Sequence, residues 1–151
     1  MEWFVRAFLR ASLAWLGLGV TLGVAMAVQP AWVVYRPAHL HMNLLGFVTM
    51  MIFGVAFHVI PRFTGQALHS DRLAGSQWWM SNAGLALMVV GFGLRPHGSP
   101  VSTLVLGAGG TLGALGAYAF IYNIWRTLGA AAMRRPPVRT TGKPLPTVTQ
   151  G

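Results

Sequence analysis

Residues 38–65 read AHLHMNLLGFVTMMIFGVAFHVIPRFTG, and this stretch decides the fold. It contains no formally charged residue over Leu40–Ile60, so as one helix it is long enough to cross a bilayer hydrocarbon core of about 30 Å. His39 and His41 lie at its start, and His58 lies near its end. Because histidine is costly inside a membrane helix, these side chains are the first candidates for a functional site.

The spacing of the histidines limits what they can do together. Two residues on an α-helix correspond to about 200° of rotation, so His39 and His41 point to nearly opposite faces. They cannot readily grip one metal ion from a single helix, but they can serve two sites, one on each side. His58 follows His41 by about 26 Å along the helix and belongs to the opposite membrane surface.

The composition indicates a small integral membrane protein. The chain has 151 residues, 54% of them hydrophobic, and its acids are Glu2 and Asp71 alone. It has no cysteine, which excludes disulfides, thiolate metal sites and covalent c-type heme attachment. The net charge of +9 comes from loops and tails that flank apolar segments. We therefore discount nucleic acid as a partner and expect membrane lipid instead.

Four apolar segments predict an all-α bundle of four transmembrane helices that forms one domain over residues 1–129. We expect the helices at about 4–28, 38–61, 77–94 and 101–125, with Pro61 ending the second. A polar turn is expected between the second and third helices. Residues 130–151 are rich in proline and are expected to form a disordered cytoplasmic tail.

Glycine pairs on the first and last helices predict close helix packing. Gly19 with Gly23, and Gly109 with Gly113, have the four-residue spacing that lets helix backbones approach. The alternative for the first segment is a signal peptide cleaved near Ala25-Met26-Ala27, although its apolar run is long for one.

The positive charges predict the orientation. Four spans place both termini on one side of the membrane, and nine of the eleven Lys and Arg residues lie on that side. The two on the other side are Arg36 and Arg95, so the positive-inside rule puts both termini in the cytoplasm. We expect a multi-pass protein of the inner (cytoplasmic) membrane of a prokaryote, with His39 and His41 just inside the outer surface.

Heme ligation is the favoured use of the histidine pair. Imidazole is an axial ligand of heme iron, and a bundle of apolar helices can hold the macrocycle. Heme also carries two propionates, and Arg36 and Arg95 are the cations on the histidine side. The alternative is that His39 and His41 are interfacial histidines bonded to loop carbonyls or water.

Other polar side chains are expected to have lesser roles. Asn43 and Thr49 are expected to form hydrogen bonds between helices, or else to line a heme edge. His58 is expected at the surface next to Arg62 rather than as a ligand of a second, inner heme. His69 and His97 are expected to be solvated loop residues. These expectations leave His39 and His41 as the candidate metal ligands.

The histidine stretch resembles a known helix. Ala38-His39-Leu40-His41, then Gly54, Pro61 and Thr64-Gly65, keep without a gap the spacing of the helix that carries the H-x-H heme-ligand motif in the catalytic subunit of heme-copper oxidases. The resemblance covers 28 of the 151 residues. It implies that the first histidine corresponds to the ligand of the high-spin, oxygen-reactive heme and the second to the ligand of the low-spin heme.

The chain also departs from that family. The oxidase subunit has twelve helices in three similar four-helix arcs, whereas four are expected here. The sequence has no His-His pair, no H-x-x-x-Y stretch and no acid within its spans, so the copper site, its crosslinked tyrosine and the acidic proton routes have no counterparts. Oxygen reduction coupled to proton pumping is therefore not expected of this chain alone.

Copies of the chain can supply the missing arcs. A closed ring can place His39 of one copy opposite His41 of the next, with a six-coordinate, bis-histidine heme at each contact. The family's low-spin heme is held across two arcs in a similar way, and this resemblance favours a homotrimer with three hemes b. A dimer with two hemes also satisfies the ligand count.

The expected function is that of a b-type heme membrane protein for electron transfer or redox sensing, with an unidentified electron donor and acceptor. We do not expect the chain to be an enzyme by itself. One alternative is a five-coordinate heme at His39 that binds oxygen or nitric oxide with the help of a partner subunit. Another is a non-heme small transporter or assembly factor whose histidines line a polar cavity.

Overall fold

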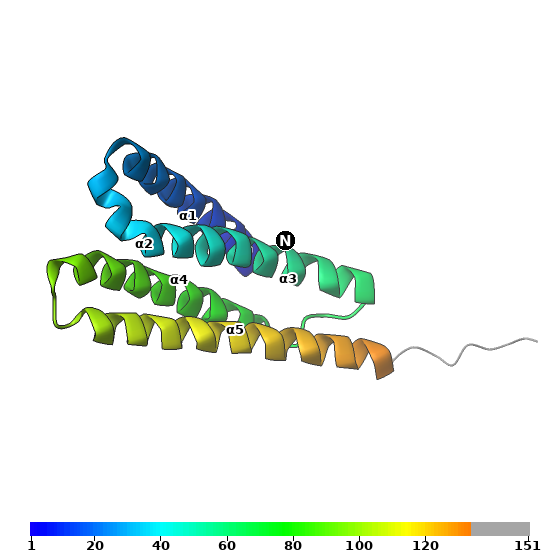
Figure 1. The fold of residues 1–151 in the computed structure, drawn as a ribbon. Coiled ribbons are helices and arrows are strands. Elements are labelled where there is room, and N and C mark those ends of the chain that lie inside the picture. The colour runs from blue at the N-terminus through cyan, green and yellow to red at the C-terminus, as the bar shows by residue number, and fades with distance from the viewer. Residues whose placement is uncertain (134–151) are drawn as a thin grey trace, which may run out of the picture.

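The computed structural model describes residues 1–133, which form two antiparallel helix hairpins packed side by side (Figure 1). The first hairpin consists of α1 (Trp3–Val28), a 3-10 turn η1 (Pro30–Tyr35) and one long helix in three parts, α2 (Arg36–His41), η2 (Met42–Thr49) and α3 (Met50–Thr64). The second consists of α4 (Asp71–Leu94), a 3-10 turn η3 (Arg95–His97) and α5 (Ser102–Met133). The expected all-helical architecture is confirmed over these residues.

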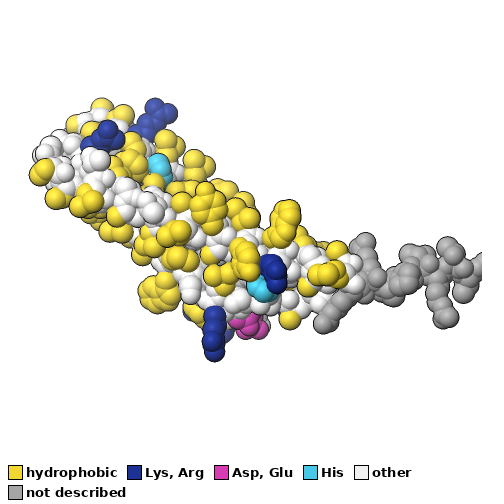
Figure 2. Space-filling view, turned by 90° about the horizontal axis from the view of Figure 1, so that it is seen from below, with side chains coloured by type: hydrophobic (Ala, Val, Ile, Leu, Met, Phe, Trp, Pro, Cys, Tyr) yellow, Lys and Arg dark blue, Asp and Glu magenta, His cyan; other side chains and the backbone are white. Residues whose placement is uncertain are grey.

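Three of the described helical stretches are long and apolar enough to cross a membrane: Trp3–Val28, Pro30–Thr64 and Ser102–Met133. α4 is 24 residues long and lies along α5, but it carries more polar side chains, among them Gln77 and Ser81, which are buried inside the bundle. On the face that Figure 2 shows, hydrophobic side chains cover the middle and charged side chains gather toward the ends. This distribution fits a membrane protein, because charges are tolerated only near the membrane surfaces.

Two predicted helix boundaries in the middle of the chain were wrong. The second helix continues past Pro61 to Thr64 and ends at Gly65, whose φ of 64° is the left-handed conformation that glycine adopts without strain. α4 begins at Asp71 rather than at Gln77, because the Ser70 side chain caps it by accepting a hydrogen bond from the Leu73 N–H at 3.2 Å. Part of the expected polar turn is therefore helix.

The last helix is also longer than expected. α5 continues beyond residue 125 to Met133, so residues 130–133 of the expected tail are helical. The alanines at 130–132 have a high helix propensity, which outweighs the helix-breaking effect expected from the nearby prolines. The remainder of the expected tail, residues 134–151, lies outside the described residues.

The sequence predicted a regular α-helix for the second helix, and this was wrong. Its middle part, η2, is a π-helix of 8 residues that follows directly on His41. Within it the Thr49 hydroxyl donates to the Leu44 carbonyl, five residues back, at 2.8 Å. A Cβ added at Gly46 would lie 2.6 Å from the Trp15 side chain, so this part of the helix presses closely on α1. Such π-helical segments are rare and often occur at functional sites.

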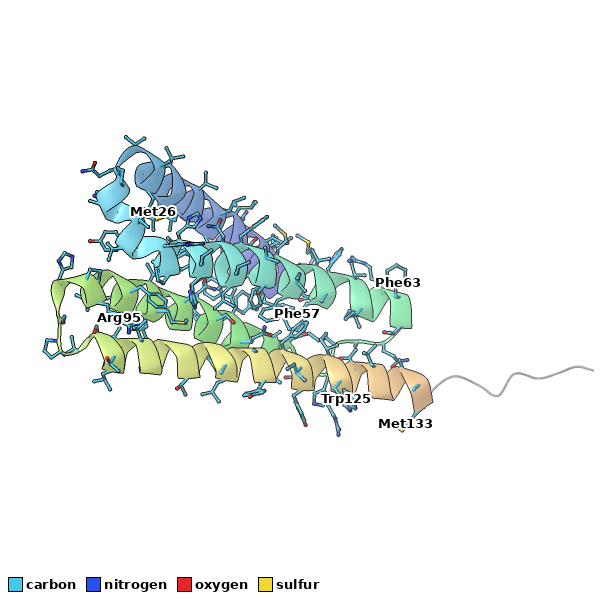
Figure 3. The ribbon with its side chains drawn as sticks, in the orientation of Figure 1. Met26, Phe57, Phe63, Arg95, Trp125 and Met133 are labelled. Carbon is cyan, nitrogen blue, oxygen red and sulfur yellow. The ribbon has the colours of Figure 1, made fainter. Side chains whose placement is uncertain are left out.

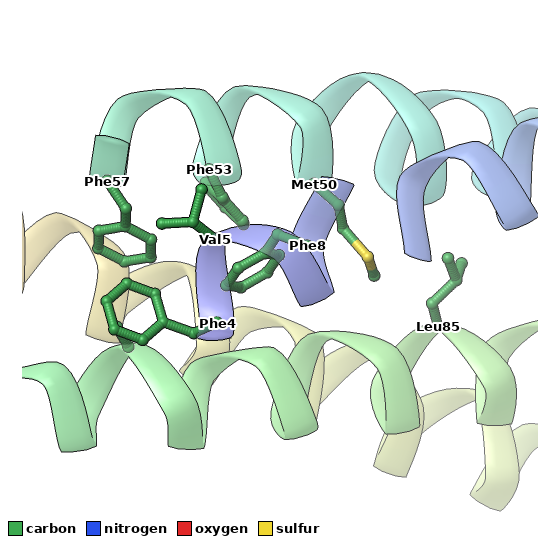
Figure 4. Packing of buried hydrophobic residues seen from close by; sticks show 8 residues of the cluster. Phe4, Val5, Phe8, Met50, Phe53, Phe57 and Leu85 are labelled. Carbon is green, nitrogen blue, oxygen red and sulfur yellow. The ribbon is translucent and has the colours of Figure 1, made fainter. Parts of the chain in front are cut away.

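The core lies where the two hairpins meet and is rich in aromatic rings (Figure 4). α1 contributes Phe4 and Phe8, and α3 contributes Phe53 and Phe57. Edge-to-face packing joins the two helices, with ring centroids 5.6 Å apart for Phe4 and Phe57 and 5.9 Å apart for Phe8 and Phe53. The cluster packs α1 against α3, further along the second helix than the histidines.

Glycines bring α4 and α5 together, as the sequence predicted for the last helix. A Cβ added at Gly84 would lie 2.6 Å from the Gly113 nitrogen and 2.8 Å from the Gly109 oxygen. The two backbones therefore meet without intervening side chains.

Two buried amides behave differently in this second hairpin. Asn123 is fully buried, and its side chain accepts from the Ser70 N–H at 3.0 Å and donates to the Ser70 carbonyl at 2.8 Å. Gln77 is equally buried, yet neither its nitrogen nor its oxygen finds a hydrogen-bond partner among residues 1–133. An unpaired buried amide is costly, so Gln77 is a local weak point of the packing.

Candidate functional site

His39 lies at the end of α2, half-buried against α1. Its Nδ1 is 2.8 Å from the carbonyl oxygen of Gly19 on that helix. A carbonyl oxygen only accepts hydrogen bonds, so Nδ1 carries the proton, and in the neutral ring Nε2 then has the lone pair. The ring is thus anchored across two helices through Nδ1.

His41 is anchored within its own helix. Its Nδ1 is 2.8 Å from the carbonyl oxygen of Pro37, four residues back, and by the same reasoning it donates to that oxygen. The ring packs at a tilt on Phe92 of α4, with centroids 4.8 Å apart. His41 therefore also keeps Nε2 available, on a different side of the helix from His39.

The geometry separates the two imidazoles, as their spacing predicted. α2 packs on both α1 and α4, and His39 contacts the first while His41 contacts the second. One chain therefore cannot direct both Nε2 atoms at a single iron. Over residues 1–133 there is no group of three or more His, Cys, Asp or Glu side chains that could hold a metal ion by themselves.

Arg36 and Arg95 lie at the same end of the molecule as the histidines. Arg36 opens α2 and Arg95 follows α4, and both side chains are exposed. A hydrogen bond of 3.2 Å between the Tyr35 hydroxyl and Nε2 of His97 joins the two turns that carry them. Figure 3 shows Arg95 at the end where α1 finishes, opposite the end that holds Phe63 and Met133.

The polar residues beside the histidines have other partners than expected. We expected Asn43 and Thr49 to hydrogen-bond between helices, and this was wrong. Asn43 donates from Nδ2 to the His39 carbonyl at 2.8 Å, and Thr49 donates to the Leu44 carbonyl, both within their own helix. They satisfy backbone carbonyls around the π-helix, where the regular α-helical bonding is broken.

The other histidines lie away from this site. His58 contacts the Arg62 side chain, and both line a pocket of about 290 Å³ at the opposite end, together with Glu2 and Asp71. The exposed His69 packs its ring on Tyr122, with centroids 5.6 Å apart. His97 is exposed and bonded to Tyr35.

Sequence reasoning missed several residues of the site. Phe92 and the carbonyls of Gly19 and Pro37 contact the imidazoles, and Gly23 lies directly against the His39 ring. A signal existed for the two glycines, because their four-residue spacing marks a surface where another helix approaches. No local pattern marks Phe92, since its contact depends on how α4 packs on α2.

The arrangement defines a helical membrane protein with two imidazoles at one end of its bundle, each anchored through Nδ1 to a backbone carbonyl. No family model matches the chain. It is 25% identical over 157 residues to the Cbb3-type cytochrome c oxidase subunit CcoN1 of Stutzerimonas stutzeri, an alignment that covers 84% of this chain and 33% of that protein. The chain thus spans about a third of the relative's length. The similarity supports a relationship to heme-copper oxidase subunits over most of the chain rather than over the histidine helix alone.

Proposed function

We propose that this chain is a b-type heme protein of the membrane, in which His39 of one copy and His41 of another ligate the same iron. The observation that carries the proposal is that both rings use Nδ1 on a backbone carbonyl, at 2.8 Å in each case. Histidines that bind metals commonly donate their second ring N–H to such an acceptor, which fixes the tautomer and raises the basicity of the ligating nitrogen.

The two ligand directions favour a ring of copies. His39 contacts α1 and His41 contacts α4, so each copy offers one imidazole to each of two neighbours. Repeating such a contact around a closed ring leaves no ligand unused. The oxidase subunit that the histidine helix resembles has three four-helix arcs, and this favours a homotrimer with three hemes. A dimer with two hemes would use the same contacts.

The two arginines suit the acidic edge of a heme. Arg36 and Arg95 are exposed near the histidine end and are free to extend along the membrane surface. A guanidinium can bind a carboxylate through two parallel hydrogen bonds. We assign these side chains to the heme propionates.

Electron transfer or redox sensing is the function that this ligand set supports. A bound heme supplies one-electron redox chemistry, and two imidazoles would fill both axial positions of its iron. The relative is named as a cytochrome c oxidase subunit, and this supports heme as the cofactor of the present chain. In the proposed topology, four helices span a prokaryotic cytoplasmic membrane with both termini inside, and the donor and acceptor are unidentified redox partners.

The test is a visible spectrum of the detergent-purified protein, oxidised and dithionite-reduced, with and without carbon monoxide. We expect sharp reduced α and β bands that carbon monoxide does not change. His39→Ala and His41→Ala should each abolish this spectrum. The matched controls His58→Ala and His69→Ala, which alter histidines at the other end of the bundle, should leave it intact.

Other outcomes would contradict the proposal. A carbon monoxide shift in the wild-type protein would mean an open iron position and would support a five-coordinate, gas-binding heme enzyme at His39. Absence of a Soret band after expression with added heme would exclude heme and support a transporter or assembly factor.

A further inference from the structure

The His39 imidazole lies in a cradle formed by two glycines of α1. A Cβ added at Gly23 would lie 2.8 Å from Cε1 and 3.3 Å from Nδ1 of the ring. A Cβ added at Gly19 would lie 2.6 Å from Nδ2 of Asn43, the residue one turn beyond His39. The 2.8 Å and 2.6 Å distances are shorter than real Cβ atoms show, so glycine at both positions is what permits the contact.

Asn43 completes the cradle from the π-helix. Its Nδ2 donates to the His39 carbonyl at 2.8 Å and lies 3.3 Å from Nδ1 of the same residue. A protonated Nδ1 is compatible with both neighbours, because the ring N–H donates to the Gly19 carbonyl while the amide donates to the His39 carbonyl. A bare Nδ1 would instead face the Gly19 carbonyl as a second acceptor at 2.8 Å and could accept only the longer contact from the Asn43 amide at 3.3 Å. The contacts therefore favour one tautomer.

We propose that Gly19 and Gly23 are positioning residues, which hold the His39 ring so that Nδ1 keeps its proton and Nε2 keeps its lone pair. That the lone pair is for iron rests on the proposed function, whereas the cradle and the tautomer do not. The fold thereby couples the packing of α1 to the ligand position of a residue twenty positions further along the chain.

His41 provides an internal comparison. Its Nδ1 bonds to Pro37 in its own helix and its ring lies on Phe92 of α4, so α1 plays no part in its placement. A change on α1 at Gly23 should therefore disturb His39 and leave His41 as it is. A general loss of helix packing would disturb both.

The first measurement is ¹⁵N nuclear magnetic resonance of the histidine rings in the full chain prepared without heme. We expect a protonated Nδ1 signal for His39 that is lost in Gly23→Ala. It should be retained in Gly17→Ala, a matched control on the same helix where an added Cβ meets nothing within 4 Å. The His41 signals should be unchanged in both variants.

A second variant keeps the test decisive if Gly23→Ala does not fold. Gly19→Ala places a Cβ 2.6 Å from Nδ2 of Asn43, a side-chain end that can move aside, and we expect it to lengthen the Gly19 carbonyl contact and let the His39 proton exchange between Nδ1 and Nε2. If every variant that folds keeps the wild-type His39 signal, the cradle does not determine the tautomer and the proposal is overturned.

Hemin titration then separates this proposal from the function it rests on. Because loss of such supporting contacts typically weakens metal binding by about 10–100-fold, Gly23→Ala should bind hemin that much more weakly than Gly17→Ala. If the wild-type protein binds no hemin but the tautomer shifts as expected, the cradle stands and the heme function falls. If the wild-type protein binds hemin, and Gly23→Ala and Gly17→Ala match it in both the resonance measurement and the hemin titration, the heme function stands and the cradle falls.

Discussion

Gly84→Ala tests how α4 and α5 are held together. The new Cβ would lie 2.6 Å from the nitrogen and 3.0 Å from the Cα of Gly113, and 2.8 Å from the oxygen of Gly109. All three are backbone atoms of α5, which cannot swing aside as the end of a flexible side chain can. The two helices must therefore separate to admit the methyl group.

The magnitude follows from two opposing terms. Overpacking a well-packed site costs about 1–3 kcal/mol, whereas replacing glycine by alanine inside a helix gains up to about 1 kcal/mol. Gly107→Ala in α5 is the matched control, because a Cβ there meets nothing within 4 Å and only the helix gain applies. The difference in unfolding free energy between the two variants isolates the packing term, and we expect Gly84→Ala to be less stable by about 1–3 kcal/mol.

The assay is unfolding in mixed micelles with an increasing fraction of sodium dodecyl sulfate, followed by circular dichroism. Both variants should show the same helical signal before the transition, with the midpoint of Gly84→Ala at the lower detergent fraction. Equal midpoints would refute the reasoning, since they would mean that the backbones are not in direct contact at this crossing.

Three further predictions use the same unfolding assay. Thr49→Val removes the hydroxyl that donates to a carbonyl five residues back, and it should destabilise the protein by about 0.5–1.5 kcal/mol. The comparison is Thr21→Val, which removes a hydrogen bond to a carbonyl four residues back on α1. A neutral Thr49→Val would mean that the hydroxyl does not stabilise the π-helix. Gln77→Met removes an unpaired buried amide and should stabilise by about 1–3 kcal/mol, whereas a loss of stability would mean that the amide has a partner. Asn123→Leu leaves the Ser70 N–H unpaired and removes one of the two donors to the Ser70 carbonyl, and it should cost about 1–3 kcal/mol, with an unchanged midpoint counting against this account.

The helical bundle could be predicted because membrane solvation leaves few choices. An uncharged run such as Leu40–Ile60 can satisfy its backbone in lipid only as a helix, and the glycine pairs mark where helices approach closely. Gly109 does contact α4, and Gly19 and Gly23 do receive the histidine helix. These features depend on local sequence and on the solvent, which a sequence shows directly.

The π-helix and the start of α4 could not be predicted from such patterns. Asn43 and Thr49 bond to carbonyls of their own helix, and between them Gly46 lies closely against Trp15 of α1. Over the eight mostly apolar residues of η2, the hydrophobic pattern does not distinguish a π-helix from an α-helix. The packing of η2 on α1 is not encoded in any short stretch.

The positions of the histidines, but not their supports, followed from sequence. Two residues of spacing on a helix dictate different faces whatever the rest of the chain does. Which neighbour each face meets depends on the arrangement of α1 and α4 around α2. Phe92 therefore had no signal before the fold was known.

The different anchoring of the two imidazoles has a consequence for assembly. His39 is held across helices by the Gly19 carbonyl and the Gly23 surface, whereas His41 is held by a carbonyl of its own helix and one aromatic contact. In a ring of copies every iron would then join one firmly held imidazole to one with more freedom. Small differences in the angle between subunits can be taken up at His41 without moving His39. In the proposed ring the same ligand set therefore suits two or three copies, and packing between helices rather than the histidines would set their number.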